Sequence, residues 1–196
     1  MAKKNQRRRK NNSNSGLTFI FGVGLVLIGL AAFFMLRDTK NAAESQSVSR
    51  SVTPMEVNYP APELSLQNVN GKTESLIDYR DKVALVNNWA TWCPPCKAEI
   101  PTLEAYYKTH NVDGFVIIGI EAGEPQNDVL SFVQEHGMTY PVWFDLTRAA
   151  TNAFHYGGLP SSYVIDRKGT VRLAWVGEIN QEMLEKYVTP LITAND

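Results

Sequence analysis

Hydrophobic and polar positions divide the chain into three stretches of different character. Residues 17–36 form a run of twenty residues without a charge. Residues 37–55 are rich in Ser, Thr, Asn and Ala and show no apolar period, which is typical of a flexible linker. From residue 56 to residue 196, short apolar runs alternate with amphipathic stretches, and this pattern predicts one folded domain.

Within this predicted domain we expect strands and helices to alternate. Two short strands come first, between residues 61 and 76, around an Asn-Gly turn. The runs at 82–89 and 114–120 are mostly apolar, as in strands that are covered on both faces. Further expected elements are helices at 94–110, 125–136, 147–154 and 180–192, a strand at 140–144 and a hairpin at 162–176. This order predicts an α/β fold, a mixed sheet flanked by helices on both faces.

Charge is distributed unevenly along the sequence. The chain has 19 basic and 20 acidic residues, but six of the basic residues lie within the first ten positions. The remainder therefore carries 13 basic against 20 acidic side chains, a formal balance of −7. An acidic domain argues against nucleic acid as a partner, although the basic run by itself is also compatible with a nucleic-acid tail. The apolar fraction of 44% supports a real hydrophobic core.

The uncharged run Leu17–Leu36 is long enough to cross a membrane as one helix. Twenty helical residues at about 1.5 Å each span roughly the 30 Å hydrocarbon core. Because Lys and Arg are enriched on the cytoplasmic side, we expect residues 1–16 to be cytoplasmic and the domain to lie on the extracytoplasmic face of the cytoplasmic membrane. A cleaved signal peptide is the alternative, but its apolar region is usually about 7–15 residues. A retained signal anchor is therefore favoured.

The only two cysteines, Cys93 and Cys96, lie three positions apart. A disulfide between residues this close closes only a short loop and therefore stabilises the fold little. Outside the cytoplasm, however, such a pair could cycle between the dithiol and the disulfide. Cys93 is predicted to begin a helix after a buried strand that ends at Trp89, so free N–H groups and the helix dipole stabilise a thiolate there. Pro94 and Pro95 suit the first helical turn. We therefore predict that Cys93 is the exposed attacking thiol of low pKa and that Cys96 resolves the mixed disulfide.

Three other uses of the cysteine pair are weaker. A zinc site needs further ligands, and the three histidines show no paired spacing, so we expect no metal. Haem attachment needs Cys-x-x-Cys-His, and position 97 is lysine. A purely structural disulfide stays open as an alternative.

Two motifs resemble the thioredoxin superfamily: WATWCPPCKAEIP at residues 89–101 and GLPSSYVID at residues 158–166. More narrowly, they resemble the membrane-anchored ResA/TlpA-type proteins, and the resemblance covers about residues 56–194. It implies a thioredoxin-like mixed sheet with an N-terminal strand pair. Residues 123–144 resemble the helix and strand that this branch inserts into the core. No cofactor besides the redox-active Cys93–Cys96 disulfide is implied.

The resemblance also implies roles for residues around the cysteines. Pro160 matches the family's cis-proline, with an ordinary trans proline as the alternative, and Leu159 before it would pair its backbone with a substrate chain. Glu99 matches an acid that ResA-like proteins keep near their cysteines and would tune or relay the proton of Cys96; a solvated helix acid is the alternative. Asn87 stands where ordinary thioredoxins keep a buried aspartate, and asparagine moves no proton. The remaining residues of the expected client-binding surface are Trp92, Pro94 and Pro95.

The resulting hypothesis is a thiol-disulfide oxidoreductase of the protein-disulfide reductase type. The resemblance suggests that it reduces extracytoplasmic proteins such as apocytochrome c during cytochrome c maturation, and that an integral-membrane electron donor recharges the pair. A thiol peroxidase-like redoxin is one alternative, although such enzymes place Thr and Arg beside the attacking thiol and the nearest arginine downstream is Arg148. A redox-inert binding module and an oxidant for protein folding are the others.

Overall fold

One mixed sheet of eight strands organises the computed structural model, which describes residues 51–155 and 157–194. The strands are β1 (Met55–Pro60), β2 (Ser65–Asn68), β3 (Thr73–Ser75), β4 (Val83–Trp89), β5 (Phe115–Glu121), β6 (Val142–Phe144), β7 (Ser161–Ile165) and β8 (Thr170–Val176). Their order across the sheet is β1-β8-β7-β4-β5-β6-β2-β3. The pairs β4–β5 and β5–β6 are parallel and the others are antiparallel. This is the mixed sheet that the alternating pattern predicts.

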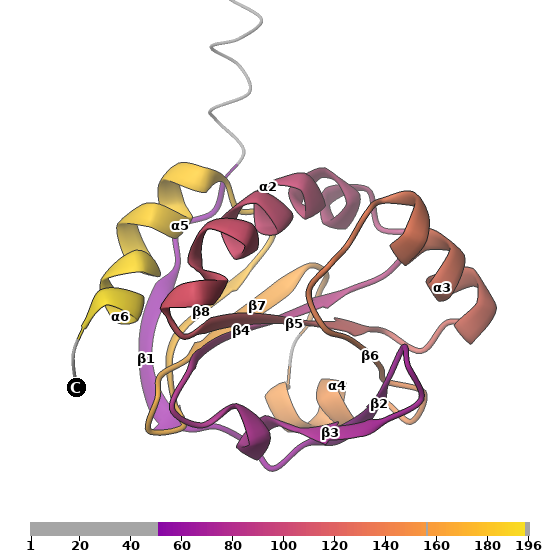
Figure 1. Cartoon of the computed structure of the whole chain (residues 1–196), viewed down its shortest axis with the longest axis horizontal. Helices are drawn as coiled ribbons and strands as arrows, with labels where there is room; N and C mark the ends of the chain where they lie inside the picture. The colour runs from indigo at the N-terminus through magenta and orange to yellow at the C-terminus, as the bar shows by residue number, and fades with distance from the viewer. Residues whose placement is uncertain (1–50, 156, 195–196) are drawn as a thin grey trace, which may run out of the picture. The chain divides into compact units, whose positions relative to one another are not determined.

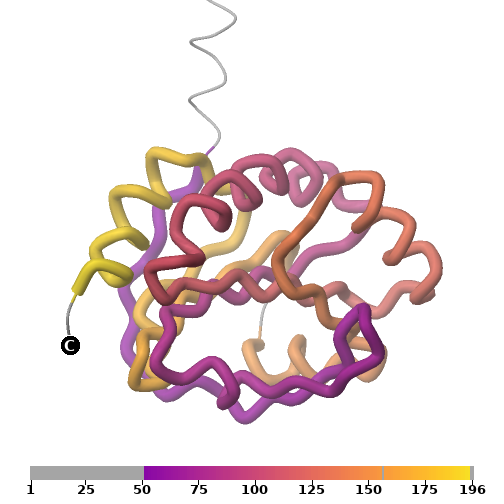
Figure 2. Tube along the Cα trace, viewed as in Figure 1, coloured from indigo at the N-terminus to yellow at the C-terminus, as the bar shows by residue number. Residues whose placement is uncertain are grey.

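Helices cover both faces of the sheet (Figures 1 and 2). They are α2 (Pro94–His110), α3 (Gln126–Glu135), α4 (Ala149–Phe154), α5 (Gln181–Tyr187) and α6 (Thr189–Thr193), with the 3-10 turns η2 (Leu76–Tyr79) and η3 (Asn111–Asp113). In Figure 1, α2, α3 and α5 lie above the central strands β4 and β5, whereas α4 and the curled β2–β3 end of the sheet lie below them. The expected N-terminal strand pair corresponds to β2 and β3. The expected inserted helix and strand correspond to α3 and β6.

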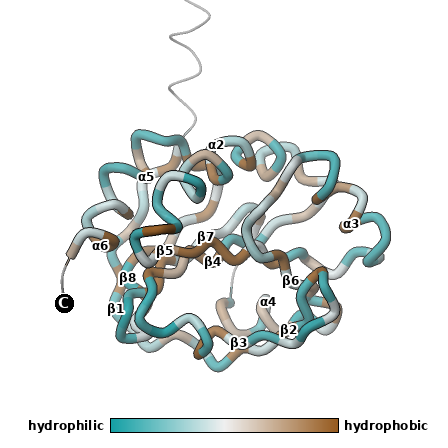
Figure 3. Tube along the Cα trace, viewed as in Figure 1, coloured by the Kyte–Doolittle hydropathy of each residue, from teal (hydrophilic) through white to brown (hydrophobic). Residues whose placement is uncertain are grey.

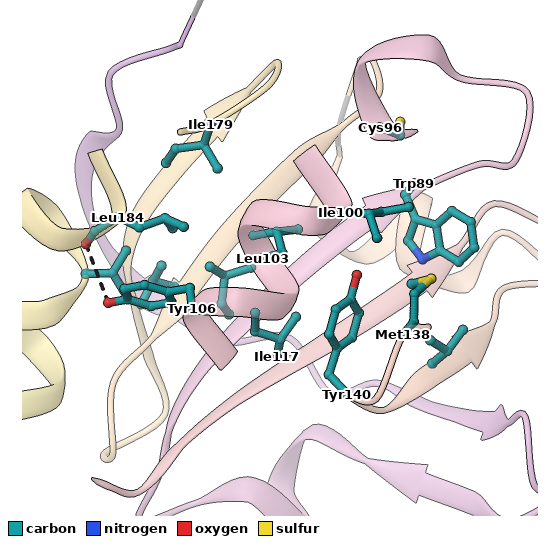
Figure 4. Packing of buried hydrophobic residues seen from close by; sticks show 14 of the residues in the cluster. Trp89, Cys96, Ile100, Leu103, Tyr106, Ile117, Met138, Tyr140, Ile179 and Leu184 are labelled. Carbon is teal, nitrogen blue, oxygen red and sulfur yellow. Dashed lines mark hydrogen bonds between the residues drawn. The ribbon is translucent and has the colours of Figure 1, made fainter. Parts of the chain in front are cut away.

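The core has two halves, one on each face of the central strands. Every residue of β4 and β5 is buried, because helices or strands cover both of their faces. Figure 3 shows hydrophobic stretches along these central strands. On the side of α2, the packed residues include Ile100, Leu103 and Tyr106 of the helix, and the Tyr106 hydroxyl donates to Leu184 O at 3.5 Å (Figure 4). The sequence prediction of two strands covered on both faces is confirmed.

The fold begins before residue 56. Residues 51–55 were expected in the linker, yet the Val52 N–H donates to Glu178 O at 3.0 Å, and the Asn180 N–H donates to the Ser51 hydroxyl at 2.9 Å. Strand β1 follows and pairs with β8. No sequence pattern predicts β1, because it is an edge strand whose residues are almost all exposed and therefore do not alternate between polar and apolar.

The C-terminal helix is also different from the prediction. A single helix was expected at 180–192, but α5 ends at Tyr187 and α6 begins at Thr189. Pro190 explains the break, because a proline ring inside a continuous helix clashes with the carbonyl four residues earlier and removes one hydrogen bond.

The expected cytoplasmic segment (1–16), the expected membrane span (17–36) and most of the expected linker (37–50) lie outside the described residues. Within residues 51–155 and 157–194, no helix combines the length and the hydrophobicity that a membrane crossing requires.

Candidate active site

Cys93 and Cys96 lie at the start of α2, directly after the central strand β4. They form a disulfide, with their Cα atoms 5.3 Å apart. Cys93 is the N-cap residue of α2, and its Sγ accepts a hydrogen bond of 3.3 Å from the Cys96 N–H. Pro94 and Pro95 occupy the first helical positions, where the backbone N–H has no partner within the helix and its absence costs no hydrogen bond. The local prediction of strand, short loop and helix start is confirmed.

The sulfur of Cys93 is less accessible than the sequence predicts. In this disulfide form Cys93 is 3% exposed and Cys96 is fully buried, and both belong to the core cluster on the side of α2. Cys93 was expected to be exposed; its bond to Cys96, which lies inside the first helical turn, explains the difference. Trp92 is 66% exposed and stands beside the pair.

The peptide bond between Leu159 and Pro160 is cis, as the resemblance implies. Pro160 directly precedes β7, and Asn88 of β4 lies opposite Ser161 of β7. Pro160 and the cysteine loop therefore lie at the same end of these two paired strands. The Pro160 carbonyl accepts from the Gly177 N–H at 2.8 Å. Within the described residues, no hydrogen bond engages the backbone of Leu159.

Glu99 is a buried carboxyl one helical turn beyond Cys96. It is 1% exposed, so the alternative of a solvated helix acid is wrong. Its Oε1 accepts from Asn87 Nδ2 at 2.8 Å, and its Oε2 accepts from the Ile179 N–H at 3.2 Å. Burial raises the pKa of Glu99 to about 8, although the two hydrogen bonds oppose that shift. A pKa this close to neutral pH allows the carboxyl both to hold and to release a proton.

Asn87 connects this carboxyl to the neighbouring strand. Its Nδ2 also donates to the Ser162 hydroxyl of β7 at 3.0 Å. The amide thus lies between the active-site helix and the strand that follows Pro160. Sequence reasoning missed Ser162, because serine carries no signal of this kind until β4 and β7 are paired.

A further polar group next to the cysteine loop was also missed. Thr91 donates its backbone N–H to the Glu124 carboxylate at 2.7 Å and its hydroxyl at 2.5 Å. Glu124 is in turn bonded through its N–H to Glu121, the last residue of β5. The one available signal was Glu121 itself, a charged residue at the end of an apolar run. The strand predicted at 114–120 stops one residue before it.

In the described part of the chain, no group of three or more His, Cys, Asp or Glu side chains is placed to hold a metal ion. Thioredoxin-fold oxidoreductases exchange disulfides through their own cysteine pair and need no separate cofactor.

The cysteine pair lies at the start of a helix that follows the central strand of a mixed sheet, and a cis-proline lies at the same end of the strands. This combination defines a thioredoxin-fold thiol-disulfide oxidoreductase. The chain belongs to the AhpC/TSA family, whose model matches residues 57–174. Among relatives, the thiol-disulfide oxidoreductase ResA of Geobacillus kaustophilus (strain HTA426) is 32% identical over 136 residues, which are 69% of this chain and 78% of that protein. The protein of the same name from Bacillus subtilis (strain 168) is 32% identical over 128 residues, 65% of this chain and 72% of that protein.

Solved structures agree with this assignment. A thiol:disulfide interchange protein of the thioredoxin family from Chlorobium tepidum TLS has a TM-score of 0.64 and is 33% identical; the match covers 70% of this chain and 99% of that one. A putative thiol:disulfide interchange protein DsbE from Chlorobium tepidum has a TM-score of 0.66 at 24% identity, with 70% and 99% covered, and this likeness supports the fold alone. The chain is therefore an enzyme, a ResA-like thiol-disulfide oxidoreductase.

Proposed function

We propose that this enzyme reduces disulfides of extracytoplasmic proteins, with apocytochrome c as the client during cytochrome c maturation. The observation that carries the proposal is the Cys93–Cys96 pair at the N-terminus of α2 with the buried Glu99 one turn beyond it. A helix N-terminus favours a thiolate, and a carboxyl of raised pKa next to the resolving cysteine suits proton exchange at neutral pH.

The first step is the attack of the Cys93 thiolate on one sulfur of the client disulfide. A bond forms between Cys93 Sγ and that sulfur, the client S–S bond breaks, and the other client sulfur leaves as a thiolate that takes up a proton. The N–H groups of the first turn of α2 stabilise the thiolate of the attacking residue. The disulfide form described above is the product state, and the proposal requires the attacking sulfur to be accessible in the reduced enzyme.

The second step releases the client. The Cys96 thiol loses its proton, and its sulfur attacks Cys93 Sγ. The mixed disulfide then breaks, the second client sulfur leaves as a thiolate, and the Cys93–Cys96 disulfide forms. Two electrons have moved from the enzyme to the client. The ionised form of Glu99, which a pKa of about 8 leaves within reach at neutral pH, is the proposed acceptor or relay for the Cys96 proton. The Asn87 amide that holds it transfers no proton.

The proposed client-binding surface surrounds the cysteines. Leu159 offers backbone groups that make no hydrogen bond within the described residues, and an extended client segment could pair with them as an added strand. Trp92 is exposed and supplies apolar contact area next to Cys93. The other members of this surface are Pro94, Pro95 and Pro160.

Location and recharging are proposed on the same basis. The uncharged run Leu17–Leu36, with the basic residues before it, would anchor the enzyme in the cytoplasmic membrane, with residues 1–16 inside and the catalytic domain outside. An integral-membrane dithiol protein is the proposed donor that reduces the Cys93–Cys96 disulfide after each turnover.

Trapping tests the proposal. The full-length Cys96→Ser variant, expressed in cells that make c-type cytochromes, should accumulate a covalent complex through Cys93, and the client in that complex should be an apocytochrome c. A Cys93→Ser, Cys96→Ser double variant is the matched control and should trap nothing. Absence of a complex, while wild-type protein restores cytochrome c in the same cells, would overturn the mechanism.

Two measurements separate the alternatives. A reduction potential near about −270 mV supports reduction of clients, whereas one near about −120 mV supports an oxidant for protein folding. Peroxide turnover by the purified protein would support a thiol peroxidase, and full cellular function of the Cys93→Ala, Cys96→Ala double variant would support a redox-inert binding module.

A further inference from the structure

Two carboxyl groups hold the loop that carries the attacking cysteine. Both oxygens of Glu121 accept from the Glu124 N–H, at 2.9 and 3.1 Å, and the Glu124 carboxylate accepts both hydrogen bonds from Thr91. Thr91 lies two residues before Cys93, in a turn that the Cys93 N–H closes onto Ala90 O at 3.2 Å. The chain of contacts therefore runs from the end of β5 to the active site.

The burial of Glu121 is unusual for a carboxyl group. Its side chain is 0% exposed at the last position of β5, and burial raises its pKa to about 7. The neighbouring Glu124 carboxyl group raises the pKa of Glu121 further, because a second negative charge nearby is unfavourable. A proton on Glu121 therefore leaves the negative charge on Glu124, which faces the two donors of Thr91.

The position of this pair relative to the cysteines is set by the sheet. Strands β4 and β5 are parallel, and Trp89 at the end of β4 lies opposite Glu121 at the end of β5. The cysteine loop and the loop that carries Glu124 therefore leave the sheet side by side. The Ala122 N–H adds a backbone hydrogen bond of 3.0 Å to Trp89 O.

We propose that Glu121 and Glu124 are positioning residues for thiol-disulfide exchange: Glu121 holds the Glu124 N–H, and the Glu124 carboxylate clamps Thr91 and so holds the Cys93 loop in its reactive conformation. This inference rests on Cys93 being the attacking thiol, as proposed above. The clamp acts through Thr91 and touches neither sulfur.

The clamp depends on pH through Glu121. As the pH rises through about 7, Glu121 loses its proton and repels Glu124, so the bonds to Thr91 weaken. The residues of β4 and β6 that pair with Glu121 are Trp89 and Phe144, which carry no charge. Asp145, which follows β6, directs its carboxylate to the N–H groups at the start of α4.

The active-site helix carries a basic side chain that faces α3. Lys97 of α2 has its Nζ 5.6 Å from the centre of the Phe132 ring of α3. Within the described residues, Glu124 is the charged side chain that acts on the titration of Glu121. Glu121 is therefore the group whose ionisation should release the clamp.

The chain contains a matched control for this clamp. Thr139 donates its backbone N–H and its hydroxyl to the Glu104 carboxylate at 2.9 and 2.5 Å, the same two bonds that Thr91 makes. Glu104 pairs with Lys108 instead of a second carboxyl group. Glu104→Gln therefore removes the charge from an equivalent Glu–Thr contact that has no second carboxyl group and lies farther along α2.

The first test measures the rate at which Cys93 of the reduced full-length protein, in detergent micelles, is alkylated by iodoacetamide between pH 5 and 9. In addition to the ionisation of Cys93, the wild-type profile should contain an inflection near pH 7. Glu121→Gln and Thr91→Val should each lose this second inflection, whereas Glu104→Gln should keep it. An inflection that persists in Glu121→Gln, or that disappears equally in Glu104→Gln, would overturn the clamp.

The second test does not depend on cysteine chemistry. The Thr91 amide of the disulfide form should be protected from hydrogen exchange below pH 7. Glu124→Ala, which leaves no acceptor for this N–H, should reduce the protection by about tenfold or more, as expected for the loss of a hydrogen bond to a charged group. An ordinary Cys93 thiol in wild-type protein, with Thr91 protected, would count against the proposed function alone. A reactive Cys93 with an unprotected Thr91 would count against the clamp alone.

Discussion

Replacing Glu99 with glutamine should change how the stability of the enzyme depends on pH. The folded state raises the pKa of Glu99 from 4.5 to about 8, mainly through burial, so it binds the proton more tightly than the unfolded chain does. Stability must then fall as the pH rises from about 4.5 to about 8 and level off above that range. Glutamine carries no titrating proton, so the variant lacks this contribution.

The size of the effect follows from the pKa shift. At about 1.4 kcal/mol per pKa unit, ionisation of Glu99 removes roughly 3 kcal/mol of wild-type stability between pH 5 and pH 8. Glutamine also places an amide NH₂ where a carboxylate oxygen accepted from Asn87 Nδ2 or the Ile179 N–H. One such donor facing another donor costs about 1–3 kcal/mol at every pH. We therefore expect Glu99→Gln to be less stable than wild type at pH 5 and similar to it near pH 8.

Urea unfolding of the full-length disulfide form in detergent micelles, from pH 5 to pH 8.5, measures this difference. Glu121 contributes a slope of the same sign, but this contribution cancels when variant and wild type are compared. Glu104→Gln is the control. Burial acts to raise the pKa of Glu104, but hydrogen bonds from Thr139 and Lys108 hold that pKa below its usual value. This variant should therefore lose stability without changing how stability depends on pH over this range. A stability difference between Glu99→Gln and wild type that stays constant with pH would refute the reasoning.

Three further variants test packing and client binding. Trp92→Ala should leave the free energy of unfolding within about 0.5 kcal/mol of wild type, because the side chain is exposed, and should raise the KM for a disulfide-containing apocytochrome c peptide several-fold in a steady-state assay; an unchanged KM would remove Trp92 from the client surface. Leu103→Ala should lower the free energy of unfolding by about 2–5 kcal/mol in urea, because Leu103 is fully buried on α2, and a loss below about 1 kcal/mol would contradict the packing. Gly123→Ala should lower the thermal midpoint of unfolding more than Gly71→Ala does. Both glycines have positive φ, but of the two only Gly123 would bring the added Cβ close to another atom, Asp145 O at 3.1 Å. Equal decreases in the thermal midpoint would show that this close approach has no effect.

Local signals were sufficient to locate the cysteine pair and its strand and helix. The run that became β4 is apolar throughout because both of its faces are covered, and such a run is visible without any knowledge of its neighbours. Pro94 and Pro95 mark a helix start for a reason that lies within one turn of chain. Strand β1 carried no such signal, because an exposed edge strand forms through its pairing with β8 and not through its own pattern.

The environment of Glu99 was beyond local inference. The resemblance pointed to this residue, but the sequence alone left a solvated helix acid open. Its two partners are Asn87, 12 positions away, and the N–H of Ile179, 80 positions away. Whether a carboxyl is buried, and therefore whether its pKa rises, depends on which distant segments cover it.

The place of the reactive sulfurs and the elements that carry them can be inferred from the chain alone, because strand runs, proline positions and the Cys-x-x-Cys spacing are properties of neighbouring residues. The surroundings of those sulfurs come from the folded arrangement: the burial of Cys93 in the disulfide form, the raised pKa of Glu99, and the contact of Glu124 with Thr91. These depend on the pairing of β4 with β5 and β7, which brings together residues 33 to 80 positions apart. Charge and accessibility are set by everything within a few ångströms, and most of that comes from elsewhere in the chain.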